Sequence, residues 1–293
     1  MMQLDKIPSI DGLKLSNFKN YYLENKRPVV IRNLTKGTFA EKNWNYDYFI
    51  NEVGNLEIEL IDEKSCDKDS STAYTKGNCK MKFEEYLTIL KKNEFTSKRI
   101  FLLNLFKVSP KLGKDFPCPK IMKGILGKLG YMFFGSKNTD VRLHYDIDMS
   151  DVLLTHFGGK KKVILVSPEY SKYLYRLPFT TFSLVDLNNP DYQKYPALNF
   201  VKGQECILEH GDSLYIPSGY WHYISYIDAG FSVSYRKLPS KLADKISGLV
   251  NICVLLPLDK IIYFFLANKW KTIKEKWTIS NSSIQSFKSY YPA

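Results

Sequence analysis

The stretch GDSLYIPSGYWH, residues 211–222, decides the fold. It predicts a turn, a short apolar strand, a Pro/Gly loop and the start of a second strand. Similar short runs lie on both sides of it: YMFFG (131–135), VRLHYDID (141–148), KVILVSP (162–168), CILEHGD (206–212), WHYISYI (221–227) and GFSVSYR (230–236). Strands this short at such close spacing are typical of an antiparallel sandwich or barrel.

The segments around this β-rich part have a different character. Residues 13–105 mix helical patterns with strands, such as the alternating run LEIELI at 56–61. Residues 62–80 and 169–200 are rich in polar and turn-forming residues, which predicts two loops. After residue 239 the pattern becomes helical. We therefore expect a mainly β protein with flanking helices and a C-terminal helical segment at 241–293.

The composition excludes several protein classes. Hydrophobic residues make up 44% and charged residues 25% of the chain, which excludes a disordered chain, a collagen-like chain and a coiled coil. The five cysteines are odd in number and form no C-x-x-C, which disfavours a disulfide scaffold or a cysteine zinc knuckle. The N-terminal stretch MMQLDKIPSIDG lacks a basic region followed by an apolar run. The expected location is therefore the reducing cytoplasm.

Charge and hydropathy do not identify the binding partners of this protein. The net charge of +12 is concentrated in residues 107–143 and 236–293. Such patches can bind nucleic acid, an anionic membrane or an acidic protein, but a lysine-rich solvated surface explains them as well, and we favour that interpretation. Residues 246–268 are apolar, yet Pro257, Asp259 and Lys260 interrupt them. We expect a packed helical segment there and no integral membrane insertion.

The four histidines all lie in the β-rich part, and they indicate a metal site. His144 and Asp146 are two residues apart, so on a strand their side chains point to one face. The hairpin at 211–222 could bring His222 across to face them. Two nitrogen donors and one carboxylate form the facial arrangement of non-heme Fe(II), which leaves three coordination positions open. An isolated H-x-D also occurs by chance, and each histidine could be an ordinary core or surface residue.

Several motifs together resemble the Jumonji-C or cupin-like family of Fe(II)/2-oxoglutarate oxygenases. They are HYD at 144–146, GKK at 159–161 followed by VILVSP, the stretch 211–222, RPVVI at 27–31 with Trp44 after it, and the insert around 189–196. The likeness is strongest to the asparaginyl hydroxylase that inhibits hypoxia-inducible factor and to its bacterial cupin-like relatives. It covers roughly residues 15–240. It implies a double-stranded β-helix (cupin or jelly-roll barrel), with a domain at 1–240 whose barrel core spans about 99–238.

The resemblance also implies roles for individual residues. His144, Asp146 and His222 correspond to the iron ligands, and Lys161 corresponds to the cation that holds the distal carboxylate of 2-oxoglutarate. Strand alternation places the neighbouring Lys160 and Lys162 on the opposite face from Lys161.

The cosubstrate pocket departs from the family pattern at two positions. Val141 stands where the asparaginyl hydroxylase has a Thr, and Phe101 stands where a cosubstrate-binding Tyr is expected. The polar residues that could supply the missing donors are Asn104, Ser232 and Ser234.

Other polar residues near these motifs have two interpretations each. Asp148 could contact substrate, but capping of the strand end is favoured. Ser150 or Asp151 are the candidates for a polar residue that often follows the H-x-D. His156 is equally compatible with a pocket and with the core, whereas His210 is expected to be structural or exposed. The residues beside His222, at 221 and 223, should serve packing.

These features predict an Fe(II)- and 2-oxoglutarate-dependent dioxygenase that hydroxylates a protein side chain. One alternative is a hydroxylase directed at nucleic acid, such as transfer RNA or a ribosome-associated RNA, which the net charge favours. Another is a non-catalytic cupin-like binding protein, which Val141 and Phe101 favour. The helices at 241–293 carry more apolar surface than a solvated tail exposes, so we expect them to build a homodimer.

Overall fold

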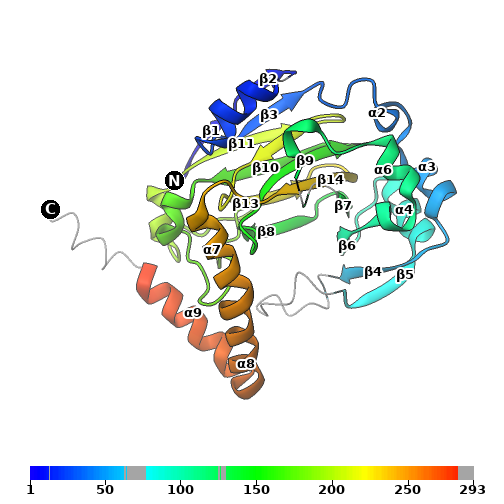
Figure 1. Ribbon diagram of the computed structural model, residues 1–293. Helices are drawn as coiled ribbons and strands as arrows, with labels where there is room; N and C mark the ends of the chain where they lie inside the picture. The colour runs from blue at the N-terminus through cyan, green and yellow to red at the C-terminus, as the bar shows by residue number, and fades with distance from the viewer. Residues whose placement is uncertain (13, 63, 65–76, 125, 127–129, 283–293) are drawn as a thin grey trace.

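Two β-sheets form the body of the computed structural model, which describes residues 1–12, 14–62, 64, 77–124, 126 and 130–282 (Figure 1). The five-stranded sheet has the order β1 (Gln3–Lys6), β11 (Lys202–Leu208), β10 (Lys161–Val166), β13 (Trp221–Tyr226) and β8 (Asp140–His144). The nine-stranded sheet has the order β2 (Ser9–Asp11), β3 (Val29–Arg32), β12 (Ser213–Ile216), β9 (Asp151–Phe157), β14 (Gly230–Lys237), β7 (Gly130–Gly135), β6 (Lys98–Leu103), β4 (Glu57–Asp62) and β5 (Cys79–Lys82). Most of the loop expected at 62–80 and the chain after residue 282 lie outside the described residues.

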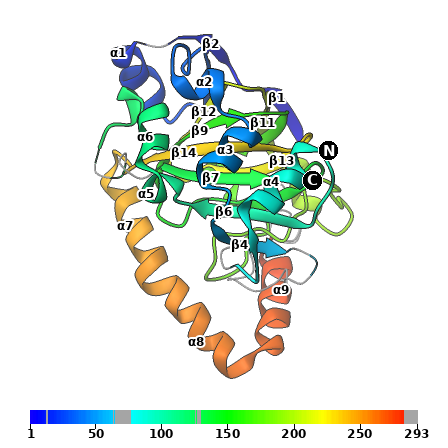
Figure 2. The same cartoon turned by 90° about the vertical axis from the view of Figure 1, so that its right-hand side faces the viewer.

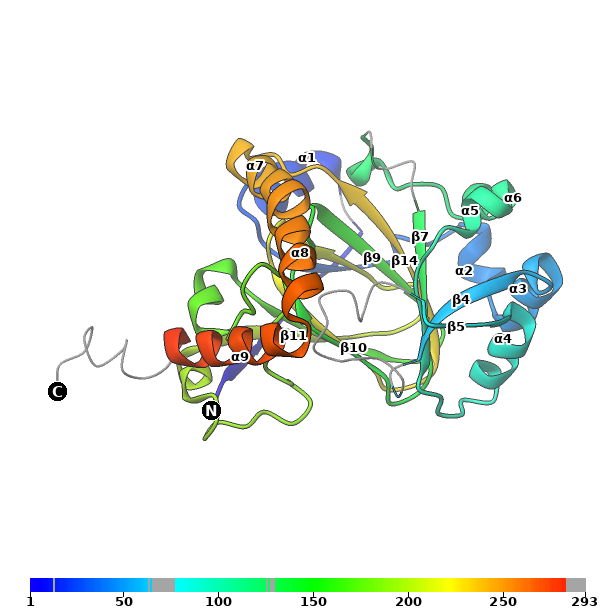
Figure 3. The same cartoon turned by 90° about the horizontal axis from the view of Figure 1, so that it is seen from below.

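The chain passes back and forth between the two sheets from β7 to β14. Strands β7, β9, β12 and β14 belong to the larger sheet, and β8, β10, β11 and β13 belong to the smaller one. All pairings among these eight strands are antiparallel. This is the double-stranded β-helix expected from the sequence, and β10 and β14 lie on opposite sides of its opening in the view from below (Figure 3).

Two central strands of the larger sheet are buried along their whole length, and the space between the sheets is largely apolar. All seven residues of β9 and all four of β12 are buried. Between the sheets, Val152, Leu154, Val163, Leu165 and Leu214 form one compact cluster. Branched side chains of this kind pack well on facing pleated surfaces, so the cluster fixes the spacing of the two sheets.

Short helices cover the outer face of the larger sheet around β7 and β14. They are α1 (Leu15–Asn17), η1 (Phe18–Leu23), α2 (Phe39–Asn43), α3 (Tyr46–Val53), α4 (Phe83–Lys91), α5 (Leu105–Val108), α6 (Pro110–Asp115) and η2 (Lys120–Met122). Asn45 caps α3 by accepting a hydrogen bond from the Tyr48 amide, and the helix ends before Gly54. The rings of Trp44, Phe49 and Phe157 join these helices to the sheet.

The segment between β10 and β11 is an irregular insert, as expected. It contains only the 3₁₀ turns η4 (Pro168–Tyr173) and η5 (Pro196–Phe200). Buried Tyr175 anchors it, because its hydroxyl accepts a hydrogen bond from the Ala197 amide. An isolated bridge joins Phe182 to His144. The insert therefore forms a wall beside the end of β8.

The C-terminal segment is a helical hairpin that projects from the barrel as a V (Figure 2). Its first arm is one continuous helix made of α7 (Leu242–Val250), the π-helical turn η6 (Asn251–Leu255) and α8 (Leu256–Leu266), and its second arm is α9 (Asn268–Ser282). Pro257 interrupts the apolar run but does not break this helix. The proline sits in the first turn of α8, directly after the π-helical turn, where its missing amide is tolerated.

The first arm is also not the packed helix that we expected. Only 11% of its most apolar 18-residue window is buried, and Leu242–Leu266 is long and apolar enough to cross a membrane by length and composition alone. Its inward contacts are polar: Asp244 pairs with Lys26, and Asn251 donates to the Ile147 carbonyl. The outward face carries exposed apolar side chains: Leu249, Ile261, Phe264 and Phe265. An ordinary surface helix turns its apolar face toward the protein and its polar face toward solvent. This arm has the opposite arrangement.

A buried ion pair joins the two arms of the hairpin. Asp259 of α8 is fully buried and accepts hydrogen bonds from Lys274 Nζ (3.1 Å) and Trp270 Nε1 (2.9 Å) of α9. Changing Asp259 to Ala leaves the Lys274 charge buried without this partner, a loss of about 3–5 kcal/mol. We expect faster amide hydrogen exchange across 256–282, measured by mass spectrometry. Lys269→Ala, an exposed change on α9, should leave the exchange unchanged. Equal exchange in both variants would disprove this coupling.

Candidate metal centre

Two histidines face each other across neighbouring strands of the smaller sheet. His144 ends β8, His222 lies near the start of β13, and the two are direct partners in the antiparallel register. Their ring centroids are 4.2 Å apart. The Nδ1 atom of His144 lies 2.7 Å from the Arg142 carbonyl, and that of His222 lies 3.1 Å from the Tyr220 carbonyl. These contacts fix both rings in the tautomer that leaves Nε2 as the ligand atom.

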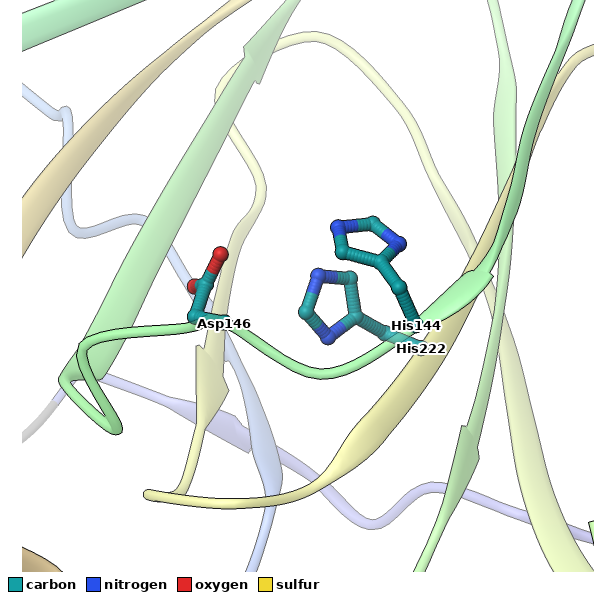
Figure 4. A group of neighbouring side chains, drawn as sticks. All are labelled: His144, Asp146 and His222. Atoms are coloured by element: carbon teal, nitrogen blue, oxygen red, sulfur yellow. The ribbon is translucent and has the colours of Figure 1, made fainter. Parts of the chain in front are cut away.

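Asp146 completes the group from a turn rather than from a strand. We expected the strand to continue through Asp146, but β8 ends at His144 and the carboxylate lies in the irregular segment that follows. The ligand atoms of the three side chains still lie within 4.8 Å of one another. Figure 4 shows the carboxylate facing the two rings. The three residues are therefore brought together without a continuous strand.

The surroundings keep these three groups in the protonation states that a metal requires. Burial, reinforced by the nearby His222, lowers the pKa of His144 to about 3, and burial also lowers the pKa of His222. Burial opposes ionisation of Asp146, but Arg236 and the two imidazoles outweigh it and lower the pKa of this carboxyl to about 2. The result is two neutral imidazoles and one carboxylate at neutral pH.

Lys161 points into the barrel, whereas its neighbours point out. Lys160 pairs with Glu209 and Lys162 pairs with Glu205 on the outer surface. The Lys161 side chain is 1% exposed, donates to Ser232 Oγ and lies 4.2 Å from the centroid of the Tyr226 ring. Burial lowers the pKa of Lys161 to about 7. The strand alternation used to choose Lys161 over its neighbours agrees with this arrangement.

Two pockets share the residues His144 and Asp146. The inner pocket is lined by Lys161, Ser234, Tyr226 and Arg236 together with apolar residues of the barrel, and it includes His144, Asp146 and His222. The outer cleft shares His144 and Asp146 but opens between β6, the insert and α8. Both are lined by Phe101 and Val141. A small molecule in the inner pocket would thus lie behind the triad, and a larger one could approach it from the cleft.

The three polar residues offered as extra donors have different positions. Ser234 lines the inner pocket, and its buried hydroxyl has no hydrogen-bond partner among the described residues. Ser232 lies deeper and contacts Lys161 and Nδ1 of His156. Asn104 is the exception: β6 ends before it, and its side chain caps α5 by accepting from the Lys107 amide. A helix N-cap must turn its oxygen toward its own helix, so Asn104 is not placed as a pocket donor.

The remaining polar candidates have structural contacts. Asp148 does not cap a strand end but pairs with Arg236 and accepts two hydrogen bonds from Ser150. Asp151 is buried and accepts from the Tyr215 hydroxyl. His156 is fully buried beside Ser232. Outside the barrel, the exposed His210 bonds the Glu41 carbonyl, and the residues at 221 and 223 are buried packing residues as expected.

Sequence reasoning missed Arg236, which pairs with both Asp146 and Asp148. The signal was present, because Arg236 follows Ser232 and Ser234 at intervals of two on the same strand. It also missed the cations of the outer cleft, Arg99 and Arg142. These two residues come from different strands, and only the paired sheets place them together.

Comparison with known proteins agrees with this fold and site. A family profile described as "Cupin-like domain" matches residues 15–242, which is most of the chain. The chain belongs to the cupin-like domain family.

Among curated proteins, the cupin-like chain is 25% identical over 258 residues to chicken (Gallus gallus) tRNA wybutosine-synthesizing protein 5, covering 82% of this chain and 80% of that protein. It is 31% identical to JmjC domain-containing protein D of Dictyostelium discoideum, covering 75% of this chain and 53% of that protein. It is 28% identical to zebrafish (Danio rerio) lysine-specific demethylase 8, covering 78% of this chain and 58% of that protein. The chain thus spans little more than half the length of the last two proteins.

The donor set of this cupin-like site fits a divalent iron ion. Two imidazole nitrogens and one carboxylate, converging from one side, match the ligand types of non-heme Fe(II) and leave positions open toward both pockets. The buried Lys161 on the same cavity supplies a cation that an anionic cosubstrate would neutralise. The residues present therefore fit both groups that the family implies.

Removal of Asp146 should abolish metal binding while the barrel remains folded. Asp146→Ala takes away the only carboxylate of the group, and we expect the Kd for Mn²⁺, measured by titration calorimetry, to rise more than about 100-fold. The matched control is His210→Ala, which changes an exposed histidine of the same domain. Circular dichroism checks the fold of both. Wild-type affinity in Asp146→Ala would remove this residue from the site.

Proposed function

We propose that this protein is an Fe(II)- and 2-oxoglutarate-dependent oxygenase. The observation that carries the proposal is the inner pocket, in which the buried Lys161 cation and the His144–Asp146–His222 group line one cavity. When bound, iron and 2-oxoglutarate supply O₂-dependent oxidation of a C–H bond, with release of succinate and CO₂. Membership of the cupin-like family, with relatives named as JmjC proteins and demethylases, supports the proposal.

The protein's own residues would bind and orient these groups. The two Nε2 atoms and the Asp146 carboxylate would hold the metal, and Lys161 would pair with the distal carboxylate of 2-oxoglutarate. The unpartnered Ser234 hydroxyl would donate to the same cosubstrate. Val152, Leu154 and Ile216 line the inner pocket with apolar surface, which excludes water from the reacting atoms.

The role of Lys161 in cosubstrate binding can be tested by comparison with its neighbour Lys162. Lys161→Ala removes a charge-assisted contact worth about 1.5–3 kcal/mol, so the Kd for 2-oxoglutarate should rise about 10- to 150-fold. Lys162→Ala, on the outer face of the same strand, should leave this Kd unchanged. Calorimetry with Mn²⁺ in place of iron measures both constants. Equal affinities in the two variants would remove Lys161 from the cosubstrate site.

The pH dependence of cosubstrate binding follows from the same lysine. Because burial lowers the pKa of Lys161 to about 7, the empty pocket holds a neutral amine above that pH. A bound dicarboxylate favours the ammonium form, so binding takes up a proton and the affinity falls by up to about tenfold per pH unit above pH 7. Calorimetry in two buffers with different ionisation enthalpies measures the proton uptake. Constant affinity from pH 7 to about pH 9 would contradict this assignment.

The outer cleft favours an anionic substrate with planar groups. Arg99, Arg142 and Lys260 line it, together with the rings of Phe101, Phe179 and Phe182. Asp146 is the only acidic side chain among the described residues that line it, and this carboxylate is paired with Arg236. Cations beside half-buried aromatic rings suit phosphates and stacked bases of single-stranded RNA better than they suit a basic peptide.

These contacts lead us to propose RNA as the substrate, in place of the protein side chain that the sequence favoured. The first matched relatives support this choice, since their name gives tRNA wybutosine synthesis and they are matched over 80% of their length. The assay incubates the iron-loaded protein and 2-oxoglutarate with bulk transfer RNA or with a protein extract. Mass spectrometry then searches nucleosides and peptides for the gain of one oxygen atom. Oxidised peptides with unchanged RNA would select the protein alternative.

RNA binding can be measured without catalysis, through its dependence on salt concentration. Lys260→Ala removes one cation from the cleft mouth, so the slope of log K for bulk transfer RNA against log salt should fall by about one. Lys202→Ala, an exposed change on β11, is the control. Equal slopes in the two variants would place the RNA elsewhere on the surface.

We also propose that the C-terminal hairpin forms a homodimer. Both arms of the V carry exposed apolar residues, including Phe264 and Phe265 on α8 and Ile273 and Trp277 on α9. A second hairpin related by a twofold axis would cover the same apolar face on each copy.

Light scattering tests this assembly. The wild-type chain should have the mass of two copies, and the double variant Phe264→Lys/Phe265→Lys should have the mass of one. Phe95→Lys changes an exposed phenylalanine outside the hairpin and should remain dimeric. A monomeric wild-type chain in detergent-free buffer would contradict the dimer. Liposome binding that depends on Phe264 and Phe265 would instead assign the face to lipid.

A further inference from the structure

The strands of the barrel position two of the three candidate ligands but leave the third without support. His144 and His222 are fixed by the pairing of β8 with β13. Asp146 lies beyond the end of β8, in a turn whose Met149 has a φ of 56°. Backbone pairing in the sheet therefore does not determine where this carboxylate lies relative to the two imidazoles.

Arg236 reaches the carboxylate from the opposite sheet. It lies near the end of β14, and its side chain is 13% exposed. Its Nη2 atom is 3.1 Å from Oδ1 of Asp146, and its Nη1 atom is 3.1 Å from Oδ1 of Asp148. One guanidinium thus bridges two carboxylates of the same turn from two separate nitrogens, a fixed planar geometry that a lysine ammonium does not provide.

Asp148 makes this contact a fixed one. Its Oδ1 accepts from the Ser150 amide (3.1 Å), and its Oδ2 accepts from the Ser150 hydroxyl (2.7 Å). These two hydrogen bonds close the turn without involving Arg236. Arg236 joins a preformed turn of β8–β9 to β14, and Asp146 is carried in that turn.

We propose that Arg236 is a positioning residue that holds Asp146 in place for the metal. Arg236 occupies Oδ1 of Asp146, so the carboxylate would bind the metal through its other oxygen. The inference rests on the proposed metal site and adds to it the residue that sets the ligand geometry. Outer contacts of this kind typically change metal affinity 10- to 100-fold.

The charges show why a cation is tolerated beside a metal site. Arg236 with Asp146 and Asp148 has a net charge of −1, the same as a lone carboxylate. Asp148 therefore compensates the charge that Arg236 would otherwise direct against a divalent ion. If Arg236 acted only by its charge, its removal would strengthen metal binding. If it positions Asp146, its removal weakens metal binding, so the direction of the change distinguishes the two roles.

The test measures Mn²⁺ binding without 2-oxoglutarate, so that no catalytic step is involved. Arg236→Met should raise the Kd for Mn²⁺ about 10- to 100-fold, and Arg236→Lys should raise it less, because lysine keeps the charge but lacks the planar fork that fixes both carboxylates. The matched control is Arg32→Met, which removes the ion pair of Arg32 with Asp212 on the same barrel. It should leave the Kd unchanged. In Co²⁺-loaded protein, the visible absorption bands should change in Arg236→Met and not in Arg32→Met.

Each alternative outcome overturns a defined part of the proposal. Unchanged or tighter Mn²⁺ binding in both Arg236 variants would overturn the positioning role. Unchanged Mn²⁺ binding with weaker 2-oxoglutarate binding would reassign Arg236 to the cosubstrate. A wild-type protein that binds no Mn²⁺ would overturn the metal site itself, and the inference with it. If Arg236→Met fails to fold by circular dichroism, Arg236→Lys decides, because it keeps the charge and removes the guanidinium; a weaker affinity supports the positioning role and an unchanged one overturns it.

Discussion

The antiparallel pairing of β8 with β13 is the constraint on which the candidate site depends. It places His144 and His222 directly opposite each other, at a register position where side chains of neighbouring strands approach closely. A shift of one residue in either strand would turn one imidazole out of the barrel. The apolar cluster between the sheets and the turn before β12 keep this register in place, so core packing and site geometry are two results of one arrangement.

A second constraint is the burial of a single cation. Among the described residues, the close partners of Lys161 are Ser232 and the face of the Tyr226 ring, and Lys161 lines a largely apolar pocket together with the triad. A lysine in such surroundings is costly in a fold that needs only stability. Its presence, directly beside two outward lysines that form ordinary ion pairs, points to a missing anion as the compensating group.

Much of this could be predicted because strand periodicity is a local property. The family resemblance selected Lys161, alternation placed Lys160 and Lys162 on the opposite face, and the turn and loop residues of 211–222 predicted the hairpin that carries His222. The position of Asp146 could be predicted only in part. Nothing local shows that β8 ends at His144, since the termination depends on the bridge to Phe182 in the distant insert.

Other features depend on contacts between distant segments and could not be predicted. Asn104 was a reasonable pocket candidate until the end of β6 made it a helix cap. Arg236 has the right spacing on its strand, but its role requires a partner turn ninety residues earlier. The C-terminal helix was expected to be packed because its apolar residues outnumber its polar ones. The few polar residues are those that contact the barrel, and a simple count cannot reveal that orientation.

Because of the first arm of the hairpin, the part of the chain that forms the candidate site extends beyond the region matched by the family profile. Gly248 leaves room for the Asp148 backbone, where a Cβ atom would come within 2.6 Å of the carbonyl oxygen, and Leu256 and Lys260 line the outer cleft. These residues lie beyond residue 242, where the family match stops. A chain shortened to the matched region would retain every candidate ligand and lose one wall of the cleft. Part of the outer cleft is thus encoded outside the region that the family profile matches.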